Sequence, residues 1–347
     1  MKRSASVRKP DVSVLMPCFN GDQWLPEAIE SVLSQTFQNY ELILVDDGST
    51  DSTLDVMRRY SDLDGRIVAI AKPHTDVSDS LNAGLAKANG TWVARLDQDD
   101  LCAPTRLSEQ ISFVSDHPDT VFLGSAYIRI DEHGREVSQH GFPASHRRLM
   151  VNLERLKGFC PHSTAFFRLD LAKKVGGCRA CLNNANDHDL WLRLASHGKL
   201  ACLSAPLVQC RGHSRQMSHD GAGEPQLVEG VAGSACHFLR KLGSQDPLEQ
   251  GNPSRAIEFL DFVRHGVRKS GLIVRRGVWG EARSEYFKRS NILSGALVFF
   301  SVLIRSGHAR KLLWEKCFGL SLPQELAKEW IRKAGYQKWS QEIGQPD

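Results

Sequence analysis

The chain has 347 residues, of which 41% are hydrophobic and 24% are charged, and its formal net charge is +4. This ordinary globular composition leaves room for one large domain with an appendage, or for two domains. The small net charge excludes a general electrostatic attraction to nucleic acid, so we expect no nucleic-acid partner.

The first part of the chain alternates short apolar runs with segments of helical periodicity. Apolar and β-branched runs predict strands, and apolar residues at helical spacing predict helices. The expected strands are residues 12–16, 41–45, 66–71 and 91–96, and the expected helices are residues 22–37, 52–60 and 78–89. Pro17 ends the first strand, and Gly90 ends the third helix. Such alternation predicts an α/β fold whose mostly parallel sheet is covered by helices on both faces.

Polar residues follow three of these strands at the point where each strand ends. They are Pro17 to Asn20, Asp46 to Ser49 and Asp97 to Asp100. In a parallel sheet the carboxyl ends of the strands meet at one edge, and ligands bind just outside that edge. We therefore expect the three loops, although far apart in the sequence, to converge on one binding site.

Beyond Pro104 the alternation is looser. The expected helices are residues 106–117 and 187–198, the expected strands are residues 120–130, 162–168 and 200–208, and the turn at 131–134 predicts a hairpin. From about residue 220 the sequence becomes basic and helix-compatible. We therefore expect a basic arm at residues 1–10, an α/β domain at residues 11–220 and a helical C-terminal extension at residues 221–347.

The distribution of apolar residues and cysteines indicates where the protein works. No apolar run reaches the ~18 residues needed to span a bilayer, and none follows the basic arm, so we expect neither a membrane span nor a secretory signal. Nine scattered cysteines, an odd number, fit a reducing cytosol better than a disulfide framework. We therefore expect a cytoplasmic protein. The spacing of Cys160, His162, Cys178 and Cys181 is poor for a zinc site.

Three carboxylates, Asp97, Asp99 and Asp100, follow the fourth strand. Clustered carboxylates raise one another's pKa unless a cation neutralises them. Mg²⁺ and Mn²⁺ prefer oxygen ligands and are often shared between one or two carboxylates and the phosphates of a substrate. The cluster therefore indicates a divalent metal site, and the alternative is a solvated loop in which Asp100 caps the next turn.

A second acidic pair, Asp46 and Asp47, follows the second strand, and Gly48 permits a tight turn after it. A carboxylate at this edge can accept a hydrogen bond from a base N–H or from a ribose hydroxyl. The alternative is helix capping by Asp47, Ser49 or Asp51. We expect at least one of the two adjacent aspartates to contact a ligand.

Three separated motifs occur in an order that is known from one protein family. They are residues 12–57, which contain DDGSTDST, residues 80–100, which end in LDQDD, and residues 186–200, which begin NDHDLWLR. Over about residues 11–218 the chain resembles the GT-A nucleotide-sugar glycosyltransferases of family 2. The resemblance implies the Rossmann-like GT-A fold and an inverting transferase of the bacterial cell-surface polysaccharide type. It also implies a nucleotide diphosphate sugar as donor and Mn²⁺ or Mg²⁺ as cofactor. Since UDP-sugars are common donors in the family, the resemblance favours a UDP-sugar.

The resemblance also assigns roles to residues in the loops. Pro17, Phe19 and Asn20 would border the nucleotide. Asp47, with the adjacent Asp46, would contact the base. Asp97 would lie near the ribose and phosphate, and Asp99 would bind the metal directly. The closing loop of the family matches residues 210–218. Arg211 would therefore bind the diphosphate, and His213 would complete the metal shell or contact phosphate.

The family places its general base in a Glu-Asp pair at the head of a helix, where this chain has Asn186 and Asp187. Asp187 is therefore expected to take the proton from the acceptor hydroxyl, with Asp189 as the competing residue. The alternative is that both aspartates only stabilise the helix N-terminus. His162 either lines the acceptor pocket or is an interior histidine.

The acceptor implied by the resemblance is a growing glycan or a lipid-linked saccharide. The basic, aromatic segment 294–319 would form a helix that either packs on the catalytic domain or lies in a membrane interface, on the inner face of the cytoplasmic membrane. Two other functions stay open. One is a non-catalytic nucleotide-sugar or glycan-binding module, which Asn186 favours, and the other is a phosphatase with Asp97 as nucleophile, which LDQDD fits poorly. The first strand lacks the GxGxxG of a nicotinamide dehydrogenase.

Overall fold

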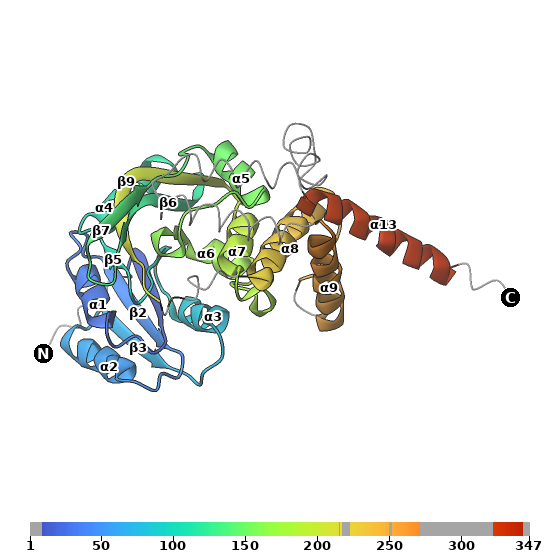
Figure 1. The fold of residues 1–347 in the computed structure, drawn as a ribbon. Helices are drawn as coiled ribbons and strands as arrows, with labels where there is room; N and C mark the ends of the chain where they lie inside the picture. Colours follow the sequence, from blue (N-terminus) through green and yellow to red (C-terminus); the bar gives the residue numbers. More distant parts are fainter. Residues whose placement is uncertain (1–8, 215, 217–222, 250–251, 271–321, 343–347) are drawn as a thin grey trace, which may run out of the picture. The chain divides into compact units, whose positions relative to one another are not determined.

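The computed structural model describes residues 9–214, 216, 223–249, 252–270 and 322–342, with side chains as far as residue 334 (Figure 1). The chain divides into two compact units, residues 1–221 and residues 222–347. The expected helix at 294–319 lies outside the described residues.

The first unit consists of one sheet and the helices that pack on it. The strands are β1 (Val12–Cys18), β2 (Tyr40–Asp46), β3 (Ile67–Ala71), β4 (Trp92–Arg95), β5 (Leu101–Cys102), β6 (Thr120–Ile130), β7 (Glu136–His140), β8 (Phe166–Arg168) and β9 (Lys199–Arg211). The helices are α1 (Leu25–Leu33), α2 (Thr53–Leu63), α3 (Val77–Lys87), α4 (Arg106–Asp116), α5 (His146–Glu154), α6 (Leu169–Lys174) and α7 (Asn186–Leu194).

Within the described residues the strand order of the sheet is β3-β2-β1-β4-β8-β6-β9-β5, and β7 pairs with β6. The strands β3, β2, β1 and β4 are all parallel, as the alternation of strands and helices predicts. β8 joins antiparallel to both β4 and β6, and β6 is parallel to β9. The parallel strands therefore direct the loops after β1, β2 and β4 to a common edge.

Helices cover both faces of the sheet, and the alternation along each strand decides which core a side chain joins (Figure 1). On β1, Val14 and Met16 pack with α1, α2 and α4, whereas Leu15 packs on the other face with α3, α5, α6 and α7. On β2 the same division separates Leu44 from Ile43. Since each buried Leu or Ile stabilises the fold by about 1.5–3 kcal/mol, strands that are apolar at every position need cover on both faces.

The structure departs from the sequence prediction at the end of β1 and before β8, and α1 and α7 are shorter than the expected helices. β1 continues past Pro17 to Cys18, because pairing with β4 ends at Leu15 and the missing proline N–H breaks no hydrogen bond there. The expected strand at 162–168 is instead a 3₁₀ turn, His162–Thr164, followed by β8. The Thr164 amide donates to the Pro161 carbonyl at 2.9 Å, which forms this turn.

The second unit is helical in the residues that the structure describes, namely α8 (Glu224–Lys241), α9 (Pro253–Lys269) and α13 (Leu322–Glu342). α8 packs against both α9 and α13. The Trp330 ring meets Phe259 edge to face, with ring centroids 5.0 Å apart. Of the helices described in either unit, none is long and apolar enough to cross a membrane.

Candidate active site

The loop after β1 is fastened to the two neighbouring loops. Asn20 has a positive φ of 47°, a conformation that is uncommon for a residue other than glycine. Its amide donates to Ser49 Oγ at 3.0 Å, and its Oδ1 accepts from the Thr50 amide at 2.8 Å. These bonds to the loop after β2 account for the strained backbone, because they hold Asn20 from both ends.

Phe19 joins the same loop to the loop after β4. Its amide donates to Gln98 Oε1, and its carbonyl accepts from Gln98 Nε2, both at 2.9 Å. The Phe19 side chain is 41% exposed, and its ring stacks on the ring of His74 with centroids 4.3 Å apart and planes 18° apart. The sequence predicts the convergence of the loops, and these bonds show how they hold one another.

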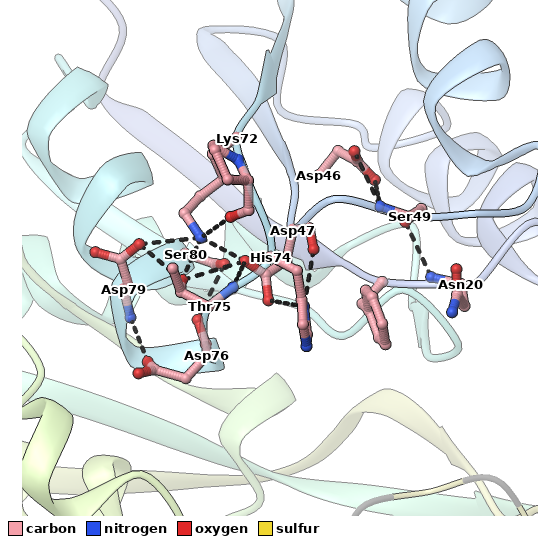
Figure 2. Close-up of polar contacts among 12 residues, drawn as sticks. Asn20, Asp46, Asp47, Ser49, Lys72, His74, Thr75, Asp76, Asp79 and Ser80 are labelled. Atoms are coloured by element: carbon pink, nitrogen blue, oxygen red, sulfur yellow. Dashed lines mark hydrogen bonds and ion pairs between the residues drawn. The ribbon is translucent and has the colours of Figure 1, made fainter.

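Asp47 lies at the end of β2 and is surrounded by hydrogen-bond donors from the segment after β3 (Figure 2). Lys72 forms an ion pair with its carboxylate, and the Thr75 amide donates to Oδ1 at 3.1 Å. Burial by itself would raise the pKa of Asp47, but hydrogen bonds from Lys72, Thr75 and Ser80 outweigh burial and hold the pKa below its usual value. Asp47 is therefore a carboxylate at neutral pH, and its oxygens can accept hydrogen bonds.

Asp46 plays a different part from its neighbour. Its carboxylate is buried and accepts from the Ser49 amide at 3.3 Å, so it closes the turn in which Gly48 has a φ of +72°. The Lys72 amide also donates to the Asp46 carbonyl at 3.0 Å. The carboxylate of Asp46 thus bonds within the loop itself, whereas the carboxylate of Asp47 faces the segment after β3.

The acidic cluster after β4 combines three different environments. Burial alone would raise the pKa of Asp97, but Arg95, His162 and Ser163 outweigh burial and hold it below its usual value. For Asp99, burial and the neighbouring Asp97 raise the pKa although His213 acts against them. Burial and the two other aspartates raise the pKa of Asp100 well above its usual range. Burial and the charges of the neighbouring carboxylates thus oppose the ionisation of Asp99 and Asp100.

The closing loop reaches this cluster from the end of β9. His213 Nε2 lies 2.7 Å from Asp99 Oδ2, and the His213 ring packs on Trp24 with centroids 4.1 Å apart. The Arg211 amide donates to Asp100 Oδ1 at 2.8 Å. The Arg211 guanidinium binds Glu27 of α1 at 2.6 Å and the Asp99 carbonyl at 3.0 Å, so it is buried against protein groups.

The donor atoms in this place suit a divalent cation that also binds a ligand. Among the described residues no three His, Cys, Asp or Glu side chains are grouped as a metal site. Asp99 and His213 nevertheless offer one carboxylate oxygen and one imidazole nitrogen side by side. Mg²⁺ and Mn²⁺ commonly use one or two protein ligands together with phosphate and water oxygens. The pair therefore fits a metal that is completed by a phosphorylated ligand.

The two aspartates at the head of α7 lie in contrasting surroundings. Asp187 is half-buried and accepts from the His188 amide at 2.7 Å. Burial raises its pKa, and the charge of Asp97 adds to the rise. Asp189 is fully buried and forms ion pairs with Arg193 at 2.7 Å and Arg179 at 3.3 Å. Asp189 therefore holds arginines in the interior, and Asp187 is the residue whose raised pKa suits proton transfer.

Two further groups lie near this helix. Asn186 donates from Nδ2 to the Asn183 carbonyl at 2.9 Å, while its buried Oδ1 has no hydrogen-bond partner among the described residues. Burial and the nearby Arg95 lower the pKa of His162 to about 3, so this histidine is neutral. Its ring meets Trp191 at a centroid distance of 5.8 Å. His162 thus packs beside Trp191 and is partly buried.

Several residues of the site escape a reading of the sequence. Lys72 and His74 follow β3 at the same edge as the acidic loops, so the rule that located those loops would have found them too. Ser163, which donates to Asp97 Oδ2 at 2.7 Å, carries no such signal. As for the cysteines, none of those that the structure describes forms a disulfide, and burial raises the pKa of Cys178 to about 12.

Comparison with known proteins adds a family to this geometry. The family described as glycosyl transferase family 2 matches residues 13–176. The putative glycosyltransferase EpsE of Bacillus subtilis is 36% identical over 195 residues, which are 54% of this chain and 68% of that protein. The amylovoran biosynthesis glycosyltransferase AmsE of Erwinia amylovora is 33% identical over 206 residues, which are 58% of this chain and 76% of that protein.

Two solved structures share the fold. TarS 1–349 of S. aureus in complex with UDP-GlcNAc has a TM-score of 0.54 and 19% identity, and the match covers 75% of this chain and 74% of that one. The mannosyltransferase PcManGT of Pyrobaculum calidifontis, in complex with GDP-Man and Mn²⁺, has a TM-score of 0.51 and 16% identity over 92% of this chain and 86% of that one. They confirm the mixed α/β GT-A architecture that the sequence predicts.

Proposed function

Because the chain belongs to the family 2 glycosyltransferases, we propose that this enzyme transfers a sugar from a nucleotide diphosphate sugar to a hydroxyl acceptor with inversion at the sugar C1. The observation that carries the proposal is the arrangement at one edge of the sheet. A carboxylate that can read a base, Asp47, belongs to the same set of linked loops as the acidic cluster at Asp99.

The donor nucleotide is proposed to bind along the loops after β1 and β2. The half-exposed Phe19 ring offers a face for the base, and Asp47 offers a carboxylate for a base N–H. Pro17 and Asn20 would border the nucleotide from the same loop, and Asp97 would lie toward the ribose and phosphate. A UDP-sugar is the favoured donor, since the structurally similar TarS binds UDP-GlcNAc.

The diphosphate is proposed to lie against the acidic cluster, where Asp99 and His213 would hold Mn²⁺ or Mg²⁺. A bound cation would supply positive charge to stabilise the nucleoside diphosphate as it leaves. Without it, the carboxylates of the cluster, among them Asp97 whose pKa is held low, would repel a diphosphate. The guanidinium of Arg211 would contribute by fixing the Asp99 carbonyl, to which it already donates.

Asp187 is proposed to act as the general base. As the acceptor oxygen forms its bond to C1 from the face opposite the diphosphate, the C1–O bond to the diphosphate breaks, and the hydroxyl proton passes to the Asp187 carboxylate. A carboxylate whose pKa is raised by burial is a stronger base than an exposed one. The ion pairs of Asp189 support this choice of residue.

The acceptor is proposed to be a growing glycan or a lipid-linked saccharide, because the relative AmsE is named for the biosynthesis of a polysaccharide. We infer a cytoplasmic enzyme, with peripheral contact at the inner face of the membrane where the acceptor is lipid-linked.

The proposal is tested with a panel of UDP-, GDP-, ADP- and CDP-sugars, with Mn²⁺ or Mg²⁺ present. We expect slow hydrolysis of one donor, faster release of its nucleoside diphosphate with acceptor, and loss of both with a chelator. Binding without turnover would favour the non-catalytic module instead. If no nucleotide sugar bound or turned over, the proposed function would be wrong.

A further inference from the structure

We propose that the imidazole of His74 occupies the place of the donor base and must leave it before a nucleotide binds. This inference rests on the proposed function, since it concerns the same donor site. By competing with the donor base for the same place, the His74 side chain lowers the affinity of the site for the donor.

The first observation is the stacking of His74 on Phe19. The two rings lie nearly parallel, with centroids 4.3 Å apart and planes 18° apart. A nucleobase bound at an aromatic side chain adopts the same offset, parallel arrangement. The imidazole thus covers a face of the Phe19 ring that a base would use.

The second observation is the hydrogen bonding of the same imidazole. His74 Nδ1 lies 2.9 Å from Asp47 Oδ2 and 3.0 Å from the Asp47 carbonyl oxygen. Both neighbours are acceptors, so Nδ1 carries a hydrogen and donates it. The ring N–H of a uracil or guanine base is a donor of the same kind. One planar ring of the protein therefore makes both contacts, the stack and the N–H bond, that recognition of a base would make.

The third observation is that His74 is the contact of Asp47 that can most easily be withdrawn. Asp47 Oδ1 is bound by Lys72 and by the Thr75 amide, and Lys72 also binds Asp79 at 3.0 Å. The side chains of Lys72 and Asp47 are only 13% and 7% exposed, whereas that of His74 is 57% exposed. An incoming base therefore gains the Oδ2 acceptor at the least cost by displacing the imidazole (Figure 2).

The backbone around His74 keeps this exchange local. A Cβ on Gly48, whose φ is +72°, would lie 2.6 Å from the backbone nitrogen of His74, so the two loops are in contact there. The next residue, Thr75, is held through its amide by Asp47, and Asp76 accepts from the Asp79 amide at 2.8 Å to cap α3. The backbone is therefore held at His74 and just after it, and the side chain can leave by rotating about its own bonds.

The test compares binding of UDP to the full-length wild type and His74→Ala by calorimetry, with Mn²⁺ present. If the imidazole covers the site in nine of ten molecules, its removal lowers the apparent Kd about tenfold. We expect a decrease of about three- to tenfold for UDP and no change for inorganic pyrophosphate, which lacks a base. His74→Ser, which also removes the ring, should behave alike if either variant folds poorly.

His117→Ala is a matched control. His117 also stacks on a phenylalanine, Phe113, with centroids 4.1 Å apart, but it lies at the C-terminal end of α4, away from the acidic loops, so UDP affinity should not change. An unchanged or higher Kd for UDP in both His74 variants would overturn the inference and leave the proposed function intact. If neither the wild type nor these variants bound any nucleoside diphosphate, both proposals would be wrong.

Discussion

Asp99 Oδ2 lies 2.7 Å from His213 Nε2, although the two residues are 114 positions apart in the sequence. The sheet brings them together, because Asp99 follows β4 and His213 follows β9, which pairs with β5 just beyond the acidic loop. Burial and the charge of Asp97 raise the pKa of Asp99. A positive charge beside Asp99 would therefore stabilise its carboxylate against both burial and the charge of Asp97.

Replacement of Asp99 by Asn should abolish the dependence of turnover on a divalent metal. Replacing a group that only orients metal ligands lowers metal affinity or activity about 10–100-fold. Replacing a direct ligand should therefore lower the rate of turnover at least about 100-fold. The measurement is the rate of nucleoside diphosphate release as Mn²⁺ is titrated. Asp119→Asn, which removes an exposed carboxylate paired with Lys199, is the control. An Asp99→Asn enzyme with the wild-type Mn²⁺ curve would contradict the assignment.

Replacement of Asp187 by Asn should remove proton transfer and leave donor binding intact. The loss of a general base lowers kcat by about 10²–10⁴. The amide has nearly the same shape as the carboxylate, and Asp187 makes its described contact at the head of α7, so UDP should bind with unchanged affinity. Stopped assays of sugar transfer, together with UDP calorimetry, separate the two quantities. A full rate in the variant would show that another group takes the proton.

Replacement of Asp189 by Asn, two positions along the same helix, should act on stability. The substitution leaves Arg193 and Arg179 buried without their carboxylate, and breaking a buried ion pair from one side costs about 3–5 kcal/mol. The free energy of unfolding from urea titration should fall by this amount, while kcat per folded molecule changes little. If the Asp189→Asn variant kept the wild-type stability but lost kcat, Asp189 would be the general base in place of Asp187.

Replacement of Gly48 by Ala should disturb the loop that carries His74. An alanine at a φ of +72° is strained by about 1–2 kcal/mol, and its Cβ would lie 2.6 Å from the backbone nitrogen of His74. We expect a lower free energy of unfolding and weaker UDP binding, because the segment that positions Lys72 and Thr75 must shift. Gly65→Ala, where a Cβ meets no atom within 4 Å, is the matched control. Equal behaviour of the two variants would show that this close approach is unimportant.

The parallel arrangement of the first strands, and the edge at which their loops meet, could be predicted from the sequence. Apolar runs such as residues 41–45 are buried on both faces, and this pattern depends only on near neighbours in the chain. The alternation also fixed which loops lie together, since parallel strands end at one edge. The prediction of strands, helices and acidic loops therefore needed no knowledge of long-range contacts.

The details that failed or were missed depend on contacts between distant residues. The difference between Asp187 and Asp189 arises from Arg179 and Arg193, whose positions follow from the packing of α7. The partnership of Ser163 with Asp97 spans 66 positions and arises from a 3₁₀ turn that periodicity does not reveal. Spacing along one chain carries no record of such pairs, so their chemistry appears only in the folded structure.

The raised pKa of Asp187 should be visible in the pH dependence of kcat. The base must be ionised to accept a proton, so kcat should rise with pH through the folded-state pKa, above the value of about 3.9 for an ordinary aspartate. Linkage gives the opposite sign for stability. Because burial and Asp97 raise the folded pKa, the contribution of Asp187 to stability is complete below the unfolded pKa and is lost as pH rises through the folded one.

The two effects can be measured on one pair of proteins. Rates of sugar transfer and urea unfolding curves are recorded from about pH 3 to pH 8 for the wild type and Asp187→Asn. In the wild type, kcat should increase over the pH interval in which this residue's share of the stability is lost. In the variant, the part of each pH dependence that comes from Asp187 should be absent, because asparagine does not titrate. A wild-type kcat that had already reached its plateau at the pH of an ordinary carboxyl group would contradict the raised pKa.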